Sequence, residues 1–261
     1  MTNTPSPVVW LTGWGFRPSV LSQLIQQTHQ QLSLMGGNAA AHIPDLLADS
    51  PPSASLNDWA DQLASRLTPG SHVIGWSLGG MLALALAARH PDKVSSLSLI
   101  ATSARFVCPD DTAPAGLAYG TVHEFNHGFA TQPAAILKRF LALQCLGDQQ
   151  RRLAGQQLAE HLVSELDTHH AALAQGLQLL ADSNLCAMLP SITQPVRILH
   201  GAGDALMPVA GSHWLTEQLP NAGLTVFADS GHALPVTQTA CCAALLASHL
   251  LDGMDFRQAT L

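Results

Sequence analysis

Short apolar stretches alternate with longer helical patterns along most of this 261-residue chain, and this alternation constrains the fold more than any other feature. The predicted strands are residues 8–11, 39–43, 72–74, 97–100, 196–200 and 224–227. The predicted helices between them are residues 17–34, 56–67, 80–89, 209–219 and 238–251. Because strands that alternate with helices form a parallel sheet covered on both faces, we predict an α/β fold.

One region breaks the alternation. Residues 106–190 contain no predicted strand, and the helices expected there, at 133–146, 149–166 and 168–188, are rich in Gln, Ala and Leu. A helical insertion between two strands is typical of a lid above a catalytic site. We therefore predict a core of residues 1–105 and 191–261 and a helical cap of residues 106–190. A second helical domain unrelated to any site is the alternative.

Composition narrows the class of protein. Apolar residues make up 47% of the chain and charged residues 11%, which excludes a disordered chain. The net charge of −7 argues against nucleic-acid binding, and the longest apolar run, near residues 78–88, is too short to span a membrane. The first sixteen residues lack the charges of a secretory signal, and the five cysteines form no Cys-x-x-Cys pair. We expect a cytoplasmic monomer with reduced thiols, no metal and no cofactor.

The strongest local signal is Gly75-Trp76-Ser77-Leu78-Gly79, which matches the pattern G-x-S-x-G between a predicted strand and a predicted helix. Glycines let the chain turn sharply there, so the Ser77 hydroxyl is expected at the carboxyl edge of the sheet, beside a helix N-terminus. This context predicts Ser77 as a nucleophile. The alternative is a glycine-rich turn whose serine only caps a helix.

A serine nucleophile needs a base and an acid, and the loops after two later strands supply candidates. His232 follows the last predicted strand, in Asp229-Ser230-Gly231-His232-Ala233, and His200 is its main competitor. Asp204 follows the strand at 196–200 and is favoured over Asp229, which is too close to His232 in the chain. The predicted triad is therefore Ser77, Asp204 and His232.

The negative charge that develops on an ester oxygen during attack needs preorganised N–H donors. One predicted donor is the backbone N–H of Leu78, the residue after the nucleophile. The other is the N–H of Trp14, in the turn Thr12-Gly13-Trp14-Gly15 after the first predicted strand. An ordinary glycine turn is the alternative interpretation.

These residues together resemble the α/β-hydrolases. More narrowly, the chain resembles the pimeloyl-acyl-carrier-protein methyl ester esterases of biotin synthesis. The narrow resemblance rests on Gly13-Trp14-Gly15, on residues 75–80 with Trp76, and on Arg139-Phe140-Leu141-Ala142-Leu143-Gln144 with Gly147. Thr12 stands where that family usually has histidine.

The resemblance implies a serine carboxylesterase that cleaves the methyl ester of pimeloyl-acyl carrier protein through an acyl-enzyme and leaves the thioester intact. It implies that Trp14, Phe140 and Leu143 contact the acyl chain. The alternatives are a carboxylesterase for small free esters, which needs no carrier partner, and a non-catalytic binding module with this fold. An intact triad argues against the binding module.

A cluster of cationic side chains on the predicted cap favours an acidic binding partner. The chain has only 11 Lys and Arg, yet Lys138, Arg139, Arg151 and Arg152 fall within fifteen residues, and only Asp148 opposes them there. Such a basic patch on a predicted cap would steer an acidic acyl carrier protein to the site. We predict that Arg139 and Arg152 contact the carrier; an ordinary solvated helix face is the alternative.

Overall fold

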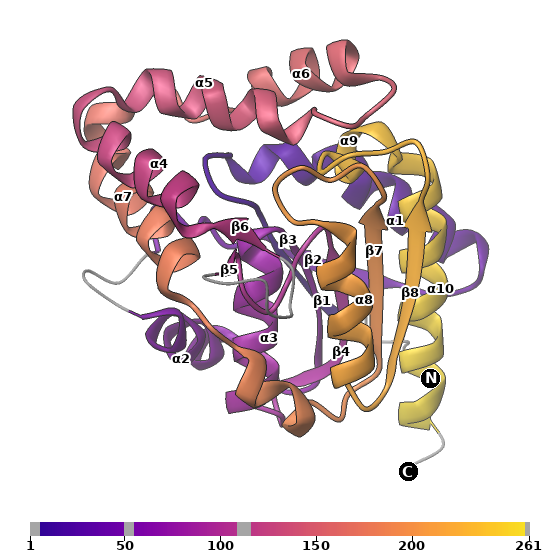
Figure 1. Cartoon of the computed structure of the whole chain (residues 1–261). Helices are drawn as coiled ribbons and strands as arrows, with labels where there is room; N and C mark the ends of the chain where they lie inside the picture. The colour runs from indigo at the N-terminus through magenta and orange to yellow at the C-terminus, as the bar shows by residue number, and fades with distance from the viewer. Residues whose placement is uncertain (1–5, 50–54, 109–115, 259–261) are drawn as a thin grey trace.

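A computed structural model describes residues 6–49, 55–108 and 116–258 of the chain. At its centre is a sheet of six strands in the spatial order β2-β1-β3-β4-β7-β8 (Figure 1). The strands are β1 Ser6–Leu11, β2 Ala39–His42, β3 Ser71–Trp76, β4 Val94–Ile100, β7 Val196–Gly201 and β8 Ala222–Phe227. All pairings in this sheet are parallel, so the strands end at one common edge. The predicted α/β fold is confirmed.

Helices cover both faces of the sheet because successive side chains of its strands point to opposite faces and are apolar on each. In β1, Val8 and Trp10 belong to one hydrophobic cluster, whereas Val9 and Leu11 belong to the other. The first cluster packs against α1 Ser22–Leu34 and α10 Thr239–Gln258, beside the short helices η1 Pro18–Leu21 and α9 Leu234–Thr237 (Figure 1). The second packs against α2 Leu56–Arg66, α3 Leu78–Arg89 and α8 Val209–Gln218.

Among the residues described between β4 and β7, four helices, here called the cap, lie at the carboxyl edge of the sheet. They are α4 Tyr119–Thr131, α5 Pro133–Gln144, α6 Arg151–Glu160 and α7 Leu166–Asp182, followed by the 3-10 helix η2 Cys186–Ser191. In Figure 1, α5 and α6 run across the top of the molecule, above the ends of β7 and β8. The six-stranded sheet takes no strand from the described part of this segment. The boundaries at residues 106 and 190 stay a prediction.

The expectation of a strand-free segment that begins with a loop is wrong in two details. Two-residue strands, β5 Val107–Cys108 and β6 Leu117–Ala118, pair with each other outside the main sheet. Strands this short have no periodicity from which they could be predicted. The helix α4 was also not expected, although its buried residues Val122, Phe125 and Phe129 are spaced as on one helical face.

Among the described residues, no helix is both long enough and apolar enough to cross a lipid bilayer.

Candidate active site

Ser77 lies at the sharp turn between β3 and α3. Its backbone angles are φ 57° and ψ −120°, a region that residues with a side chain rarely adopt and that costs about 1–3 kcal/mol. The turn is tight because α3 begins directly against β1: a Cβ at Gly79 would lie 2.7 Å from the carbonyl oxygen of Thr12. The predicted strand-to-helix turn is thus present, with Ser77 at its strained position.

Hydrogen bonds hold the backbone of Ser77 on both sides. Its N–H donates to the carbonyl of Ile100 at 3.0 Å, and its own carbonyl accepts from the Thr102 hydroxyl at 2.7 Å. Thr102 is buried in the loop after β4, next to Ala101, which has a positive φ of 45°. These hydrogen bonds to β4 and the loop after it stabilise the strained backbone conformation of Ser77.

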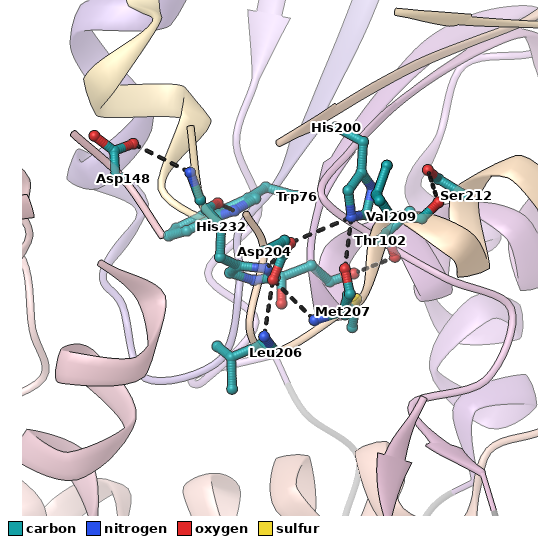
Figure 2. Close-up of polar contacts among 12 residues, drawn as sticks. Trp76, Thr102, Asp148, His200, Asp204, Leu206, Met207, Val209, Ser212 and His232 are labelled. Carbon is teal, nitrogen blue, oxygen red and sulfur yellow. Dashed lines mark hydrogen bonds and ion pairs between the residues drawn. The ribbon is translucent and has the colours of Figure 1, made fainter. Parts of the chain in front are cut away.

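The structure brings His232 and Asp204 together. Nδ1 of His232 lies 2.7 Å from Oδ2 of Asp204, and neither side chain is exposed (Figure 2). Because a carboxylate only accepts hydrogen bonds, Nδ1 carries the hydrogen and Nε2 is the basic nitrogen. The other carboxylate oxygen, Oδ1, accepts the N–H groups of Leu206 at 2.9 Å and Met207 at 2.8 Å. The rival acid, Asp229, is exposed.

His200, the competing candidate for the base, also contacts Asp204, but from the other side. Its Nε2 lies 2.6 Å from the carbonyl oxygen of Met207 and 3.3 Å from Oδ2 of Asp204 (Figure 2). The carbonyl can only accept, so Nε2 of His200 carries a hydrogen and donates it. Its imidazole is completely buried. His200 is therefore a donor that braces the carboxylate.

Burial alone would raise the pKa of the Asp204 carboxyl. The facing His232 and the hydrogen bonds from His200 and His232 outweigh burial and hold that pKa below its ordinary value. Asp204 is therefore ionised at neutral pH.

His232 is also in contact with the residue that precedes Ser77. The indole N–H of Trp76 donates to the His232 carbonyl at 3.1 Å, and the centroids of the two rings are 5.9 Å apart. Nε2 of His232 is buried and has no hydrogen-bond partner among the described residues, Ser77 included. Nucleophile–base hydrogen bonds are often long in proteins without substrate.

The two predicted oxyanion donors lie at the same edge. Leu78 is the first residue of α3, so its N–H has no partner within the helix. The turn after β1 reaches the nucleophile, because a Cβ at Gly13 would lie 3.2 Å from the Cβ of Ser77. The indole N–H of Trp14 is already used, since it donates to the carbonyl of Leu173 in α7 at 2.7 Å. Only the backbone N–H of Trp14 is a candidate donor.

The predicted acyl-chain residues share one hydrophobic cluster. Trp14 packs edge-on against Phe140, with ring centroids 4.8 Å apart, and against Phe129 at 5.7 Å. Leu143 is half-buried against the same cluster. Together with the hydrogen bond to Leu173 in α7, these contacts join the turn after β1 to the cap helices α4, α5 and α7.

The predicted carrier residues lie on the outside of the cap. Arg152 is exposed at the start of α6. The Arg139 guanidinium lies over the ring of Phe125, 4.7 Å from its centroid, and is 3.8 Å from Glu124. Lys138 and Arg151, which were noted only as part of the basic cluster, line a groove of about 260 Å³ between α5 and α6.

Thr102 could not be predicted from the sequence, because its contact with Ser77 depends on how the loop after β4 approaches the turn after β3. The contact of His200 with Asp204, four residues further along the chain, could not be predicted either, because it depends on how the chain turns after β7. A larger cavity of about 660 Å³ lies between the start of α2, α7 and η2, but no triad candidate lines it. The chemistry of the buried triad candidates therefore identifies the site better than cavity size does. The described residues contain no group of three or more His, Cys, Asp or Glu that could hold a metal ion.

Comparison with known proteins agrees with this fold. Residues 48–238 match the family described as alpha/beta hydrolase fold, and the chain belongs to that family. A solved esterase (EaEST) from Exiguobacterium antarcticum is similar, with a TM-score of 0.78 and 21% identity over 95% of this chain and 92% of that one. A thermophilic esterase from Thermogutta terrifontis gives a TM-score of 0.76 and 20% identity over 97% and 92%. At these identities the two structures support the fold alone.

Two curated relatives show to which group of α/β-hydrolases the chain belongs. The chain is 44% identical to the pimeloyl-[acyl-carrier protein] methyl ester esterase of Aromatoleum aromaticum, over 92% of this chain and 96% of the relative. It is 35% identical to the protein of the same name from Chromobacterium violaceum, over 93% of both chains. The resemblance predicted from the sequence is confirmed: within the α/β-hydrolases, the chain belongs with these esterases.

Proposed function

We propose that the protein is a serine carboxylesterase in which Ser77 is the nucleophile, His232 the general base and Asp204 the acid that orients it. The observation that carries this proposal is the buried contact of 2.7 Å between Nδ1 of His232 and Oδ2 of Asp204. It leaves Nε2 free to accept a proton, beside the strained turn that presents Ser77.

In the proposed reaction, Oγ of Ser77 attacks the ester carbonyl carbon while its proton passes to Nε2 of His232. Asp204 stabilises the imidazolium, and the N–H groups of Leu78 and Trp14 stabilise the negative carbonyl oxygen. The intermediate expels the alcohol, which takes the proton from His232 and leaves an acyl ester on Ser77. Water then loses a proton to His232 and attacks the acyl carbon. The second intermediate releases the carboxylic acid as Oγ of Ser77 leaves and takes that proton back from His232.

We propose the methyl ester of pimeloyl-acyl carrier protein as the substrate, so that methanol leaves and the thioester to the carrier stays intact. The names of the two relatives support this choice. Trp14, Phe140 and Leu143 offer apolar contacts for the acyl chain, which has to reach Ser77 from the cap side. The proposed cytoplasmic location and monomeric state follow from the sequence expectations.

The exposed cations of the cap are proposed to receive the acidic carrier. Arg139 and Arg152 were the predicted contacts, and the groove adds Lys138 and Arg151 above an apolar floor that includes Leu141. A carrier protein remains outside while its acyl arm reaches inward, so its contacts belong on the outer surface of the cap.

Replacing Ser77 or His232 by alanine tests the mechanism. We expect each variant to lose about 10³-fold or more in kcat on p-nitrophenyl butyrate, because only the oxyanion donors and substrate binding remain. Circular dichroism and the melting temperature serve as controls for folding. Near-normal turnover by a folded Ser77→Ala variant would contradict the mechanism.

The substrate is tested separately, by comparing kcat/KM of the wild-type protein for the carrier-bound methyl ester and for free dimethyl pimelate. We expect the carrier-bound ester to be preferred by about tenfold or more, since the carrier adds electrostatic steering. Equal values would favour the alternative, a carboxylesterase for small free esters.

A further inference from the structure

The turn between α5 and α6 (residues 145–150) packs directly on the loop that carries Asp204. Its Gly147 has a φ of +83°, and a Cβ there would collide with the backbone carbonyl of Gly203. A Cβ at Gly203 would in turn lie 2.6 Å from the carbonyl oxygen of Gly147. The cap and the loop of the acid therefore meet backbone to backbone, with no side chain between them.

Asp148 extends this contact to the loop of the candidate base. Only 6% of the residue is exposed. Its Oδ2 accepts the N–H of Gly231 at 3.3 Å (Figure 2). Its Oδ1 accepts the N–H of Gln150 at 2.8 Å. The neighbouring N–H of Gln149 donates to the carbonyl of Asp229 at 3.1 Å. Two hydrogen bonds thus tie the cap to the residues just before His232.

A carboxylate is the group that suits both contacts of Asp148. Asparagine has one acceptor oxygen and an NH₂ group, which would face one of the two N–H donors. A buried carboxylate is also costly unless it is well bonded, and no Lys, Arg or His among the described residues forms an ion pair with Asp148. The two N–H groups are what hold this buried carboxylate, and one of them belongs to the loop of the base.

We infer that Asp148 is a positioning residue: it holds the loop of His232 against the cap so that the imidazole stays aligned with Asp204 and Ser77. The inference rests on the proposed function of His232. Gly231 directly precedes His232, so release of its N–H acts on the imidazole through a single peptide unit. A misplacement of about 1 Å in a reacting group can cost about 100-fold in rate.

The test compares Asp148→Ala and Asp148→Asn in the full chain, with p-nitrophenyl butyrate as substrate and active sites counted with a fluorophosphonate. We expect kcat per active site to fall about tenfold or more in both variants, with KM changed less than about twofold. The matched control is Asp45→Ala, because Asp45 accepts the N–H of Leu47 at 3.0 Å in the loop after β2. This control should lose stability without losing kcat.

Hydrogen exchange supplies a readout that does not depend on activity. Amides of residues 229–233 should exchange faster in both Asp148 variants than in the wild type and in Asp45→Ala. If Asp148→Ala fails to fold, the nearly isosteric Asp148→Asn carries the test. A kcat within about twofold of the wild type in the folded variants, or an equal loss in Asp45→Ala, would overturn the inference. A wild-type protein without esterase activity would contradict the proposed function instead. Hydrogen exchange would still test whether Asp148 holds the loop of His232.

Discussion

Four polar groups contact Asp204 in a buried site: the imidazole of His232 and the N–H groups of Leu206 and Met207 donate hydrogen bonds to it, and Nε2 of His200 lies 3.3 Å from its Oδ2. Its pKa is held below the ordinary value, so the folded state favours the charged form. The stability that this pairing contributes is therefore present above about pH 4, the pKa of an unfolded Asp, and is lost as the pH falls below it. Any loss of activity between neutral pH and pH 5 should therefore not come from protonation of Asp204.

Asp204→Asn tests the assignment of the acid at the residue scale. The amide can donate to Nδ1 of His232 and so favour the wrong tautomer, and we expect kcat on p-nitrophenyl butyrate to fall about 10³–10⁴-fold. Asp229→Asn is the control, because the exposed Asp229 side chain should change kcat by less than about twofold. A mild effect of Asp204→Asn together with a severe effect of Asp229→Asn would transfer the role to Asp229.

The candidate triad could be predicted from the sequence because each of its members follows a strand of the parallel sheet. Ser77 follows β3, Asp204 follows β7 and His232 follows β8, so topology alone brings them to one edge. Thr102 and Asp148 could not be predicted in the same way. Their contacts depend on how closely loops from the core and the cap approach, which no local pattern encodes.

At the scale of elements, helix α7 of the cap lies in close contact with the predicted oxyanion turn. A Cβ on Gly176 of α7 would lie 2.6 Å from Cδ1 of Trp14 and 3.0 Å from Nε1 of the same indole. The indole cannot easily move away, because it donates to Leu173 and packs against Phe140. The position of α7 therefore bears directly on the backbone of Trp14.

Gly176→Ala sets two effects against each other. Alanine favours a helix interior over glycine by about 1 kcal/mol, whereas the added Cβ overpacks a buried indole at a cost of about 1–3 kcal/mol. We expect a net loss of stability and a lower kcat on p-nitrophenyl butyrate, as Trp14 and its N–H shift. Ala174→Gly, on the partly buried side of the same helix, is the control: it should lower the melting temperature and spare kcat. An unchanged kcat in Gly176→Ala would separate α7 from the oxyanion turn.

At the scale of the whole molecule, charge is unevenly distributed. The chain carries a net charge of −7, yet four of its 11 Lys and Arg lie on α5 and the start of α6, two helices of the cap (Figure 1), and all four are exposed. An acidic protein that approached elsewhere would meet repulsion, so association should depend on this surface. The monomeric state and the cytoplasmic location stay predictions.

Arg152→Glu tests this surface. We expect kcat/KM for the carrier-bound methyl ester to fall about tenfold at low salt and less at high salt, with a small neutral ester unaffected. Arg66→Glu makes the same change of charge on α2, away from the cap, and should spare both substrates. Equal losses on both substrates in Arg152→Glu would mean that Arg152 supports the fold of the cap. No loss on either would leave the basic cluster as a solvated face.

The strained backbone of Ser77 sets reactivity against folding. Glycine adopts positive φ freely, so Ser77→Gly would release about 1–3 kcal/mol of strain, more than the 0.5–1 kcal/mol or so that glycine costs through entropy of the unfolded chain. The inactive Ser77→Gly protein should then resist urea better than the equally inactive Ser77→Ala protein, which keeps the strain. The inactive Ser77→Gly variant would then be more stable than the native chain, which keeps the strained backbone because Ser77 is its nucleophile.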